Sequence, residues 1–200
     1  MSKSCLLSMT LALASSFAPA LTPGAQAPDF KGTDSNGVGH TLSQYHGKYV
    51  VLEWANKGCP YDQKHYLSGN MESLQKEWTG KGVVWLSVIS SAPGEQGNVS
   101  PTEENQYLKT MKASPTAALL DPEGTIARLY QAKTTPHIFV IDPMGRLIYQ
   151  GAIDDKPTTD LADVKTAHNY LNDALNAAMA GKPVTTASTR PYGCSVKYRD

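Results

Sequence analysis

The residues best suited to chemistry lie in the segment NKGCPYDQKHY, residues 56–66, which follows the apolar run YVVLEW. Cys59 is followed by Pro60 where a strand gives way to a helix. A cysteine at a helix start faces unpaired backbone N–H groups and the positive end of the helix dipole, and both favour thiolate over thiol. We therefore predict a lowered pKa and a nucleophilic sulfur at Cys59. A redox dithiol would place its second cysteine at position 62, but Asp62 stands there.

The first twenty residues differ from the rest of the chain. Lys3 is followed by the apolar stretch CLLSMTLALASSFA and by the small residues APA at positions 18–20. This pattern predicts a secretory signal peptide cut after Ala20, because the apolar stretch is too short to span a bilayer; a retained membrane anchor would need a longer one. An exported, periplasmic protein would then keep two cysteines, Cys59 and Cys194, in a compartment where disulfides persist.

Length and composition predict one domain with an extension. The 200 residues are 40% hydrophobic, which is enough for one domain with a real core. We assign that domain to residues 21–182 and a polar C-terminal tail to residues 183–200. The chain has 18 basic and 18 acidic side chains without a basic run, so a nucleic-acid partner is not expected.

Strand and helix patterns alternate along the domain. Apolar runs predict strands in KYVVLEW, VVWLSVIS, HIFVID and RLIYQGAID, with the turn PMG between the last two. Apolar residues at steps of three and four predict helices over 67–78 and 161–175, with Gly69 interrupting the first. The segment SPTEE, residues 100–104, contains a capping box with proline in the first turn. The order of elements predicts an α/β domain.

Three features together resemble the thioredoxin superfamily, in its redoxin branch of peroxiredoxins and exported thioredoxin-like oxidoreductases. They are the strand, Cys-Pro and helix of VVLEWANKGCP; TTPHIFVIDPMGRLIY, with Thr135-Pro136 before a strand; and the lead-in PGAQAPDFKGTDSNGVGHTLSQYHGKYVVLEW. The resemblance covers residues 22 to about 180. It implies a thioredoxin-like fold with a central mixed β-sheet flanked by helices, here followed by an irregular tail.

The resemblance also implies roles for individual residues. Pro136 corresponds to the family's cis-proline, which packs against the reactive cysteine, and the backbone of Thr135 would pair with an extended substrate. Pro60 is assigned to the same substrate-binding surface. Glu53 lies six residues before the cysteine, where thioredoxins keep a buried acid that helps to move protons. Burial would raise the pKa of this acid.

The chain departs from the resemblance at two positions. Asp62 replaces the second cysteine of the usual dithiol, and Asn56 stands where peroxiredoxins have a threonine. The arginine with which peroxiredoxins polarise peroxide is also missing beside the Thr-Pro pair, and Arg128 is only the nearest in sequence.

Cys194 is the most economical source of the missing sulfur. The tail carries glycine and proline, which let it turn and fold back across the domain. The arrangement would resemble two-cysteine peroxiredoxins, whose resolving cysteine is remote in sequence. A free thiol and an intermolecular bond remain alternatives for Cys194.

Metal and cofactor binding are not expected. His65 and His137 are the histidines nearest the site in sequence, and we expect both to be polar surface residues. The chain has no C-x-x-C or H-x-x-x-H pair to ligate a metal.

The sequence thus predicts an exported thiol-based oxidoreductase. The Cys59 thiolate would attack a disulfide or a peroxide, and Cys194 would resolve the intermediate. Its partner would be a thiol or disulfide redox protein, or a peroxide. Two alternatives stay open: a one-cysteine peroxidase reduced by an outside thiol, and a non-catalytic binding protein stapled by a structural Cys59–Cys194 disulfide, which can stabilise a fold by up to about 5 kcal/mol.

Overall fold

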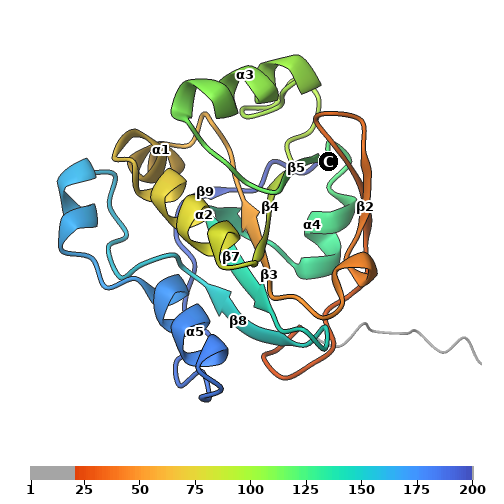
Figure 1. Cartoon of the computed structure of the whole chain (residues 1–200). Helices are drawn as coiled ribbons and strands as arrows, with labels where there is room; N and C mark the ends of the chain where they lie inside the picture. Colours follow the sequence, from red (N-terminus) through yellow and green to blue (C-terminus); the bar gives the residue numbers. More distant parts are fainter. Residues whose placement is uncertain (1–20, 200) are drawn as a thin grey trace, which may run out of the picture.

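A mixed seven-stranded sheet forms the centre of the molecule (Figure 1). The computed structural model describes residues 21–199, so the predicted signal peptide lies outside the described residues. The strand order is β2-β1-β5-β4-β3-β7-β8. The bounds are β1 (Lys31–Asp34), β2 (Gly39–Thr41), β3 (Val50–Trp54), β4 (Val84–Ile89), β5 (Ala117–Leu120), β7 (His137–Ile141) and β8 (Leu147–Gly151). Strands β3, β4 and β5 run parallel, and the other pairs are antiparallel.

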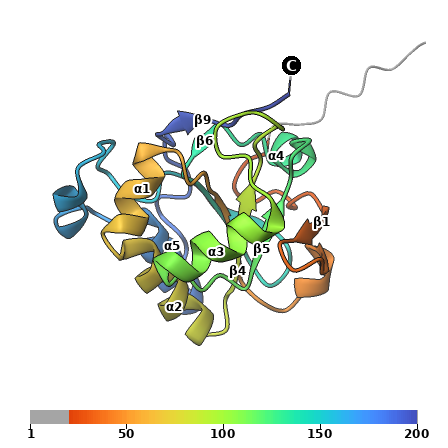
Figure 2. The same ribbon diagram turned by 90° about the horizontal axis from the view of Figure 1, so that it is seen from above.

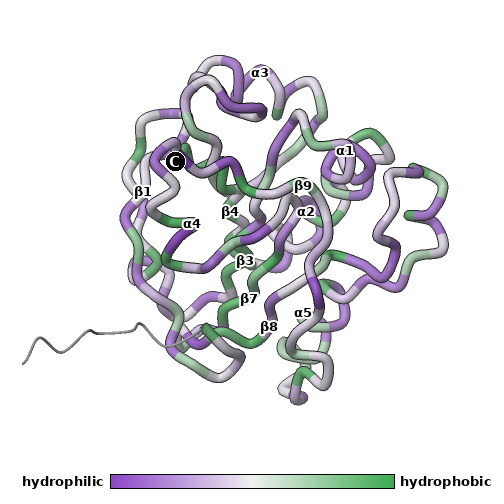
Figure 3. The backbone as a smooth tube through the Cα atoms, turned by 180° about the vertical axis from the view of Figure 1, so that it is seen from behind, coloured by the Kyte–Doolittle hydropathy of each residue, from purple (hydrophilic) through white to green (hydrophobic). Residues whose placement is uncertain are grey.

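The four strands predicted from apolar runs are confirmed as β3, β4, β7 and β8, with the Pro-Met-Gly turn between the last two. All residues of β3, β4 and β7 are buried, and Figure 3 shows these central strands as mainly hydrophobic. Strands buried on both faces read as continuous apolar runs rather than as alternating ones. Strand β5 lies in the short segment AALL, which carries no such strong signal.

Helices cover both faces of the sheet. Helices α1 (Pro60–Leu67), α2 (Asn70–Gly80) and α5 (Tyr170–Met179) contribute to one hydrophobic cluster, and α4 (Thr125–Tyr130) contributes to the other. In Figure 1 the first three stand on the left of the sheet and α4 on the right, with α3 (Pro101–Met111) above. Among residues 21–199, no helix is long and apolar enough to cross a bilayer.

Local signals set most helix boundaries. Gly69, with φ +75°, separates α1 from α2 as predicted, because glycine adopts this left-handed conformation without steric cost. Ser100 and Glu103 form the predicted capping box of α3, with Pro101 as its first residue. The helix predicted over 161–175 is wrong in its extent. The segment instead contains two elements. A short 3-10 helix, η2 (Leu161–Lys165), ends at Lys165, and α5 begins only after Asn169, which caps it by accepting a hydrogen bond from the backbone of Asn172.

The C-terminal tail returns across the domain after α5. It runs beside β8, where the amide of Thr189 donates to the carbonyl of Gln150, at 3.0 Å. It then forms the short strand β9 (Cys194–Ser195), which pairs antiparallel with β6 (Thr134–Thr135). Figure 2 shows β6 and β9 side by side at the edge of the molecule. The tail thereby brings Cys194 to the start of β7, next to the Thr-Pro segment.

Candidate active site

Cys59 occupies the start of α1. It is the N-cap, in extended conformation, and Pro60 is the first residue of the helix. The backbone N–H of Cys59 donates to the carbonyl of Asn56 at 2.9 Å. The Asn56 side chain accepts from the amide of Gly58 at 2.8 Å, so it shapes the loop that aims the thiol. The helix-start placement predicted from Cys-Pro is therefore present.

The Cys59 thiol is enclosed by the Thr-Pro segment and by the tail. Its exposed fraction is 0%. The S–H group donates to the carbonyl of Thr135 at 3.0 Å, and the backbone N–H of Cys194 donates to the Cys59 sulfur at 3.4 Å. The peptide bond between Thr135 and Pro136 is cis. Both thiols are free. Residues 135 positions apart thus meet at one sulfur atom.

The pKa values of the two thiols are shifted in opposite directions. Burial raises the pKa of Cys59, but hydrogen bonds contributed by Cys194 and Thr135 more than offset it, and the net pKa is lowered. Burial raises the pKa of Cys194, and the hydrogen bond to Cys59 and the negative charge there raise it further. Cys59 is therefore the first of the pair to become a thiolate, the reactive form of cysteine, while Cys194 keeps its proton.

Glu53 lies in β3 beneath α1 and is completely buried, as predicted. Its carboxylate accepts from the Tyr66 hydroxyl at 2.8 Å and from the Trp85 indole at 2.7 Å. Ser87 and Gln75 also donate to it, at 2.9 and 3.2 Å. Burial raises the pKa of Glu53 in spite of these four donors. Among the described residues, no hydrogen bond joins Glu53 directly to the Cys59 thiol.

Asp62 fills the position of the absent second cysteine and is also fully buried. One carboxyl oxygen accepts from the backbone N–H of Asn56, and the other has no partner among the described residues. Burial, followed by the charges of Glu53 and Cys59, raises the pKa of Asp62 well above its ordinary value. Burial and both charges therefore favour the protonated form of Asp62, which lies close enough to Glu53 and Cys59 to sense their charges.

Comparison with known protein families identifies the family of this chain. The model of the AhpC/TSA family matches residues 23–150, more than half of the chain. The chain belongs to the AhpC/TSA family. Cys59, Thr135 and Pro136 lie within the AhpC/TSA segment, whereas Cys194 lies beyond it. No curated protein sequence matches the chain.

Solved structures show the same thioredoxin-like fold as this AhpC/TSA chain. A hypothetical protein from Sinorhizobium meliloti has a TM-score of 0.75 at 22% identity, covering 90% of this chain and 97% of its own. An uncharacterized conserved protein from Geobacillus kaustophilus has the same TM-score and identity, with coverages of 90% and 93%. The thioredoxin domain of a thiol-disulfide oxidoreductase from Bacteroides vulgatus has a TM-score of 0.52 at 22% identity, with coverages of 65% and 88%.

The remaining residues considered in the sequence of this AhpC/TSA chain are Pro60 and Arg128. Pro60 is exposed beside Cys59. Arg128 lies on the exposed side of α4 with its guanidinium over the ring of Tyr198, so it is no peroxide-polarising group in this structure. Among residues 21–199, no group of three or more His, Cys, Asp or Glu side chains is arranged to hold a metal ion.

The expectation that the two histidines lie on the surface is wrong. His65 is 0% exposed and His137 is 4% exposed. Burial lowers the pKa of each to about 3, so both rings are neutral over the physiological pH range. His137 lies in β7, whose residues are all buried, and its Nδ1 accepts from the amide of Lys133 at 3.2 Å. His65 belongs to a polar cluster with the tail that sequence reasoning missed.

Three residues around the thiols escaped prediction for a common reason. Tyr192, Asp154 and Gly193 gain their importance from partners that are remote in sequence. Gly193 is the one with a local signal, since it precedes Cys194. Its φ is +132°, and a Cβ there would lie 2.0 Å from the carbonyl oxygen of Thr135. Only glycine lets the tail pass this close to β6.

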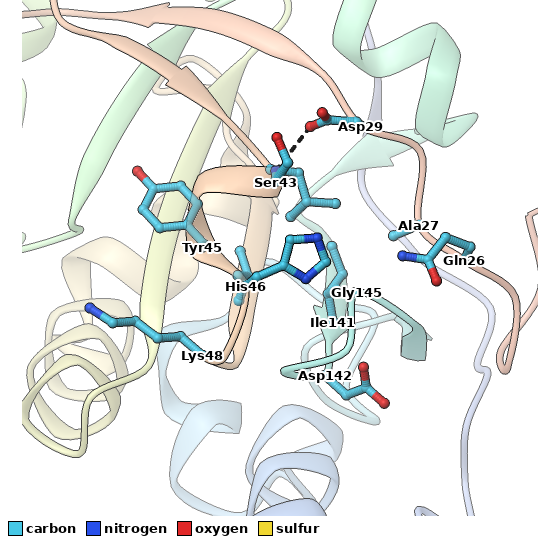
Figure 4. A pocket seen from close by; sticks show the side chains of 12 residues that line it. Gln26, Ala27, Asp29, Ser43, Tyr45, His46, Lys48, Ile141, Asp142 and Gly145 are labelled. Atoms are coloured by element: carbon cyan, nitrogen blue, oxygen red, sulfur yellow. Dashed lines mark hydrogen bonds between the residues drawn. The ribbon is translucent and has the colours of Figure 1, made fainter.

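A small cavity lies elsewhere in the AhpC/TSA segment and is not part of the thiol site. Figure 4 shows it between the lead-in, the 3-10 helix η1 (Ser43–Tyr45) and the turn after β7. Its volume is about 40 Å³. His46, Gln26 and Asp142 are among its lining residues, and none of the thiol-site residues is.

Proposed function

We propose that this protein is a thiol-based oxidoreductase in which Cys59 is the nucleophile and Cys194 is its intramolecular partner. The observation that carries the proposal is the contact of the Cys194 backbone with the Cys59 sulfur, formed across 135 residues by the tail. Family membership and the thioredoxin-like fold support oxidoreductase chemistry. The lowered pKa of Cys59 and the raised pKa of Cys194 support the order of the roles.

The proposed reaction has three steps: oxidation of Cys59, resolution by Cys194 and reduction of the resulting disulfide. The Cys59 thiolate attacks a peroxide, ROOH, and becomes a sulfenic acid as RO⁻ leaves and takes up a proton. The Cys194 thiol then attacks that sulfur, which forms the Cys59–Cys194 disulfide and releases water. With a disulfide as the oxidant, the first product is a mixed disulfide and the second step releases the other thiol. An external dithiol finally reduces the internal bond and becomes a disulfide itself.

Proton transfer at Cys59 falls to the two buried acids. The raised pKa of Asp62 favours its protonated form, and one of its carboxyl oxygens has no partner among the described residues; Glu53 lies behind it, also with a raised pKa. We assign to Asp62 the exchange of a proton with the Cys59 sulfur or its leaving group. Glu53 is the more distant acid of the pair, consistent with its missing direct contact to the thiol.

The position of the tail favours a small oxidant over a protein disulfide. Strand β9 already pairs with Thr134 and Thr135, the segment where the resemblance places an extended substrate. A polypeptide would have to displace the whole strand, whereas a peroxide or a low-molecular-weight disulfide needs only a small opening above Cys59. We also propose that the protein works after export, as the signal peptide predicts.

Peptide mapping of the mature chain, residues 21–200, tests the proposal. One equivalent of hydrogen peroxide added to reduced protein should produce a Cys59–Cys194 disulfide that dithiothreitol removes. Cys194→Ser should instead accumulate a sulfenic acid on Cys59, trapped by dimedone, and Cys59→Ser should give neither product. A parallel series with a small aromatic disulfide separates the two oxidant classes. A bond that forms but resists reductant would favour the stapled, non-catalytic protein, and unlinked cysteines would favour a one-cysteine mechanism.

A further inference from the structure

A cluster of buried polar side chains joins α1 to the tail and takes no part in the chemistry above. Its members are Lys64 and His65 of α1, Asp154 after β8, and Tyr192 of the tail; we call it the tail latch. Lys64 and His65 are 0% exposed and Asp154 is 2% exposed. Buried charges are costly unless they are paired and hydrogen-bonded. The side chains of the tail latch are therefore stable in the interior only while they stay paired and hydrogen-bonded to one another.

The Tyr192 hydroxyl is the centre of the latch. It donates to Asp154 at 2.5 Å and accepts from the Lys64 ammonium at 3.1 Å. The His65 Nδ1 accepts from the side-chain amide of Asn70 at 2.9 Å, which leaves the Nε2–H to donate to the Tyr192 hydroxyl at 3.2 Å. The Lys64 ammonium also pairs with Asp154 at 3.6 Å. One donor and two acceptor sites of a single hydroxyl are thus all in use.

The latch lies one short connection from each thiol. Helix α1, which carries Lys64 and His65, begins at Cys59. Tyr192 precedes Cys194 by two residues, and the residue between them is Gly193, whose backbone lies against the carbonyl of Thr135. Fixing the Tyr192 hydroxyl to α1 therefore fixes the distance between the two sulfur-bearing residues.

We propose that Tyr192 is a positioning residue, whose hydroxyl, held by Asp154, Lys64 and His65, keeps Cys194 against Cys59 for the resolving step. The role in resolution rests on the proposed function, in which Cys194 attacks oxidised Cys59. Tyr192 touches neither sulfur and acts only through the placement of the tail. Loss of its hydroxyl leaves the nucleophile intact, opens the tail more often and slows formation of the internal disulfide.

Tyr192→Phe tests this role against Tyr61→Phe as the matched control. The Tyr61 ring lies 5.9 Å from that of Tyr192, but its hydroxyl makes no hydrogen bond to the described residues. In a Cys194→Ser background the mature chain has one thiol, and iodoacetamide should alkylate it about tenfold faster when Tyr192→Phe is added. That factor equals about 1.4 kcal/mol, the order of one hydrogen bond to a charged group. Tyr61→Phe should leave the alkylation rate within about twofold.

The second readout follows the disulfide in chains that keep Cys194. After one equivalent of hydrogen peroxide, Tyr192→Phe should form the 59–194 bond about tenfold more slowly and accumulate dimedone-trapped Cys59, while the initial rate of peroxide consumption does not fall. A merely structural role would lower the melting temperature without changing this partition between sulfenic acid and disulfide. Hydrogen exchange at the Cys194 and Val196 amides reports tail opening directly, even in a destabilised variant.

The outcomes separate the latch from the proposed function. Alkylation and disulfide rates equal to those of the wild type would overturn the positioning role and leave the resolving role of Cys194 standing. A wild type that forms no 59–194 bond would remove the resolving role. In that case faster alkylation in Tyr192→Phe would still establish that the latch holds the tail over Cys59, and unchanged alkylation would remove the latch as well.

Discussion

Two cysteines of identical chemistry differ in acidity here because their surroundings differ. Hydrogen bonds contributed by Cys194 and Thr135 outweigh the burial of Cys59 and favour its thiolate. Cys194 faces that thiolate, so a second negative charge beside it is disfavoured and its pKa is raised. This arrangement lowers the pKa of one thiol and raises that of the other without a C-x-x-C motif.

Replacement of Glu53 tests how far a single buried carboxylate supports the site. Three of the four donors to Glu53 share one carboxyl oxygen, and the Tyr66 hydroxyl donates to the other. In Glu53→Gln the amide nitrogen takes the place of the second oxygen, so the Tyr66 hydroxyl loses its acceptor. An unsatisfied buried donor costs roughly 1–3 kcal/mol. We expect urea unfolding to show a loss of that size. If stability is unchanged but thiol exchange slows, Glu53 acts in proton transfer alone.

At the scale of elements, the pairing of β6 with β9 depends on one glycine. Gly193→Ala would place a Cβ 2.0 Å from the Thr135 carbonyl oxygen, so β9 must move away from β6. We expect Cys59 alkylation to rise by about tenfold or more, since backbone strain of this kind costs on the order of 1–3 kcal/mol.

Gly181→Ala provides the matched control for that prediction. Gly181 also has a positive φ, +69°, but a Cβ there meets no atom within 4 Å. Both variants place a Cβ at a positive φ, but only Gly193→Ala adds a clash with a neighbouring atom. Equal alkylation rates in both would show that β9 is not what shields Cys59.

At the scale of the molecule, Glu104, a buried acid in α3, makes the stability of the fold depend on pH. Burial, with a contribution from the charge of Glu53, raises the pKa of Glu104 to about 7. An acid whose folded pKa is raised stabilises the fold fully below its unfolded pKa, and this contribution is lost as pH rises through the folded value. Relative to Glu104→Gln, the wild type should therefore lose up to about 3 kcal/mol of unfolding free energy between pH 5 and 8.

Thermal or urea unfolding at several pH values measures this loss. The buried histidines change stability in the opposite direction at acid pH, so the informative quantity is the difference between wild type and variant. Glu95→Gln, at an exposed position, is the control for the loss of one carboxyl group. A constant difference between wild type and Glu104→Gln over this pH range would contradict the raised pKa.

Much of the fold was predictable because its signals are local. The apolar runs of β3, β4, β7 and β8, the break at Gly69 and the capping box of Ser100 depend on residues a few positions apart. The helix-start position of Cys59 has the same origin, since proline after the cysteine suits the first turn. The prediction over 161–175 failed because the cap at Asn169 outweighed an apolar periodicity that continued across it.

By itself the sequence determined the strand–Cys–Pro–helix setting of Cys59, for which it predicts a nucleophilic role, and the presence of a second cysteine, Cys194, remote in sequence. Only the tertiary structure decided that Cys194 meets Cys59, that β9 occupies the edge of β6, and that His65 is buried beneath Tyr192. The physical reason is that these contacts join residues more than 50 positions apart. Their free energies depend on burial and on partners supplied by other elements, which no local pattern of residues encodes.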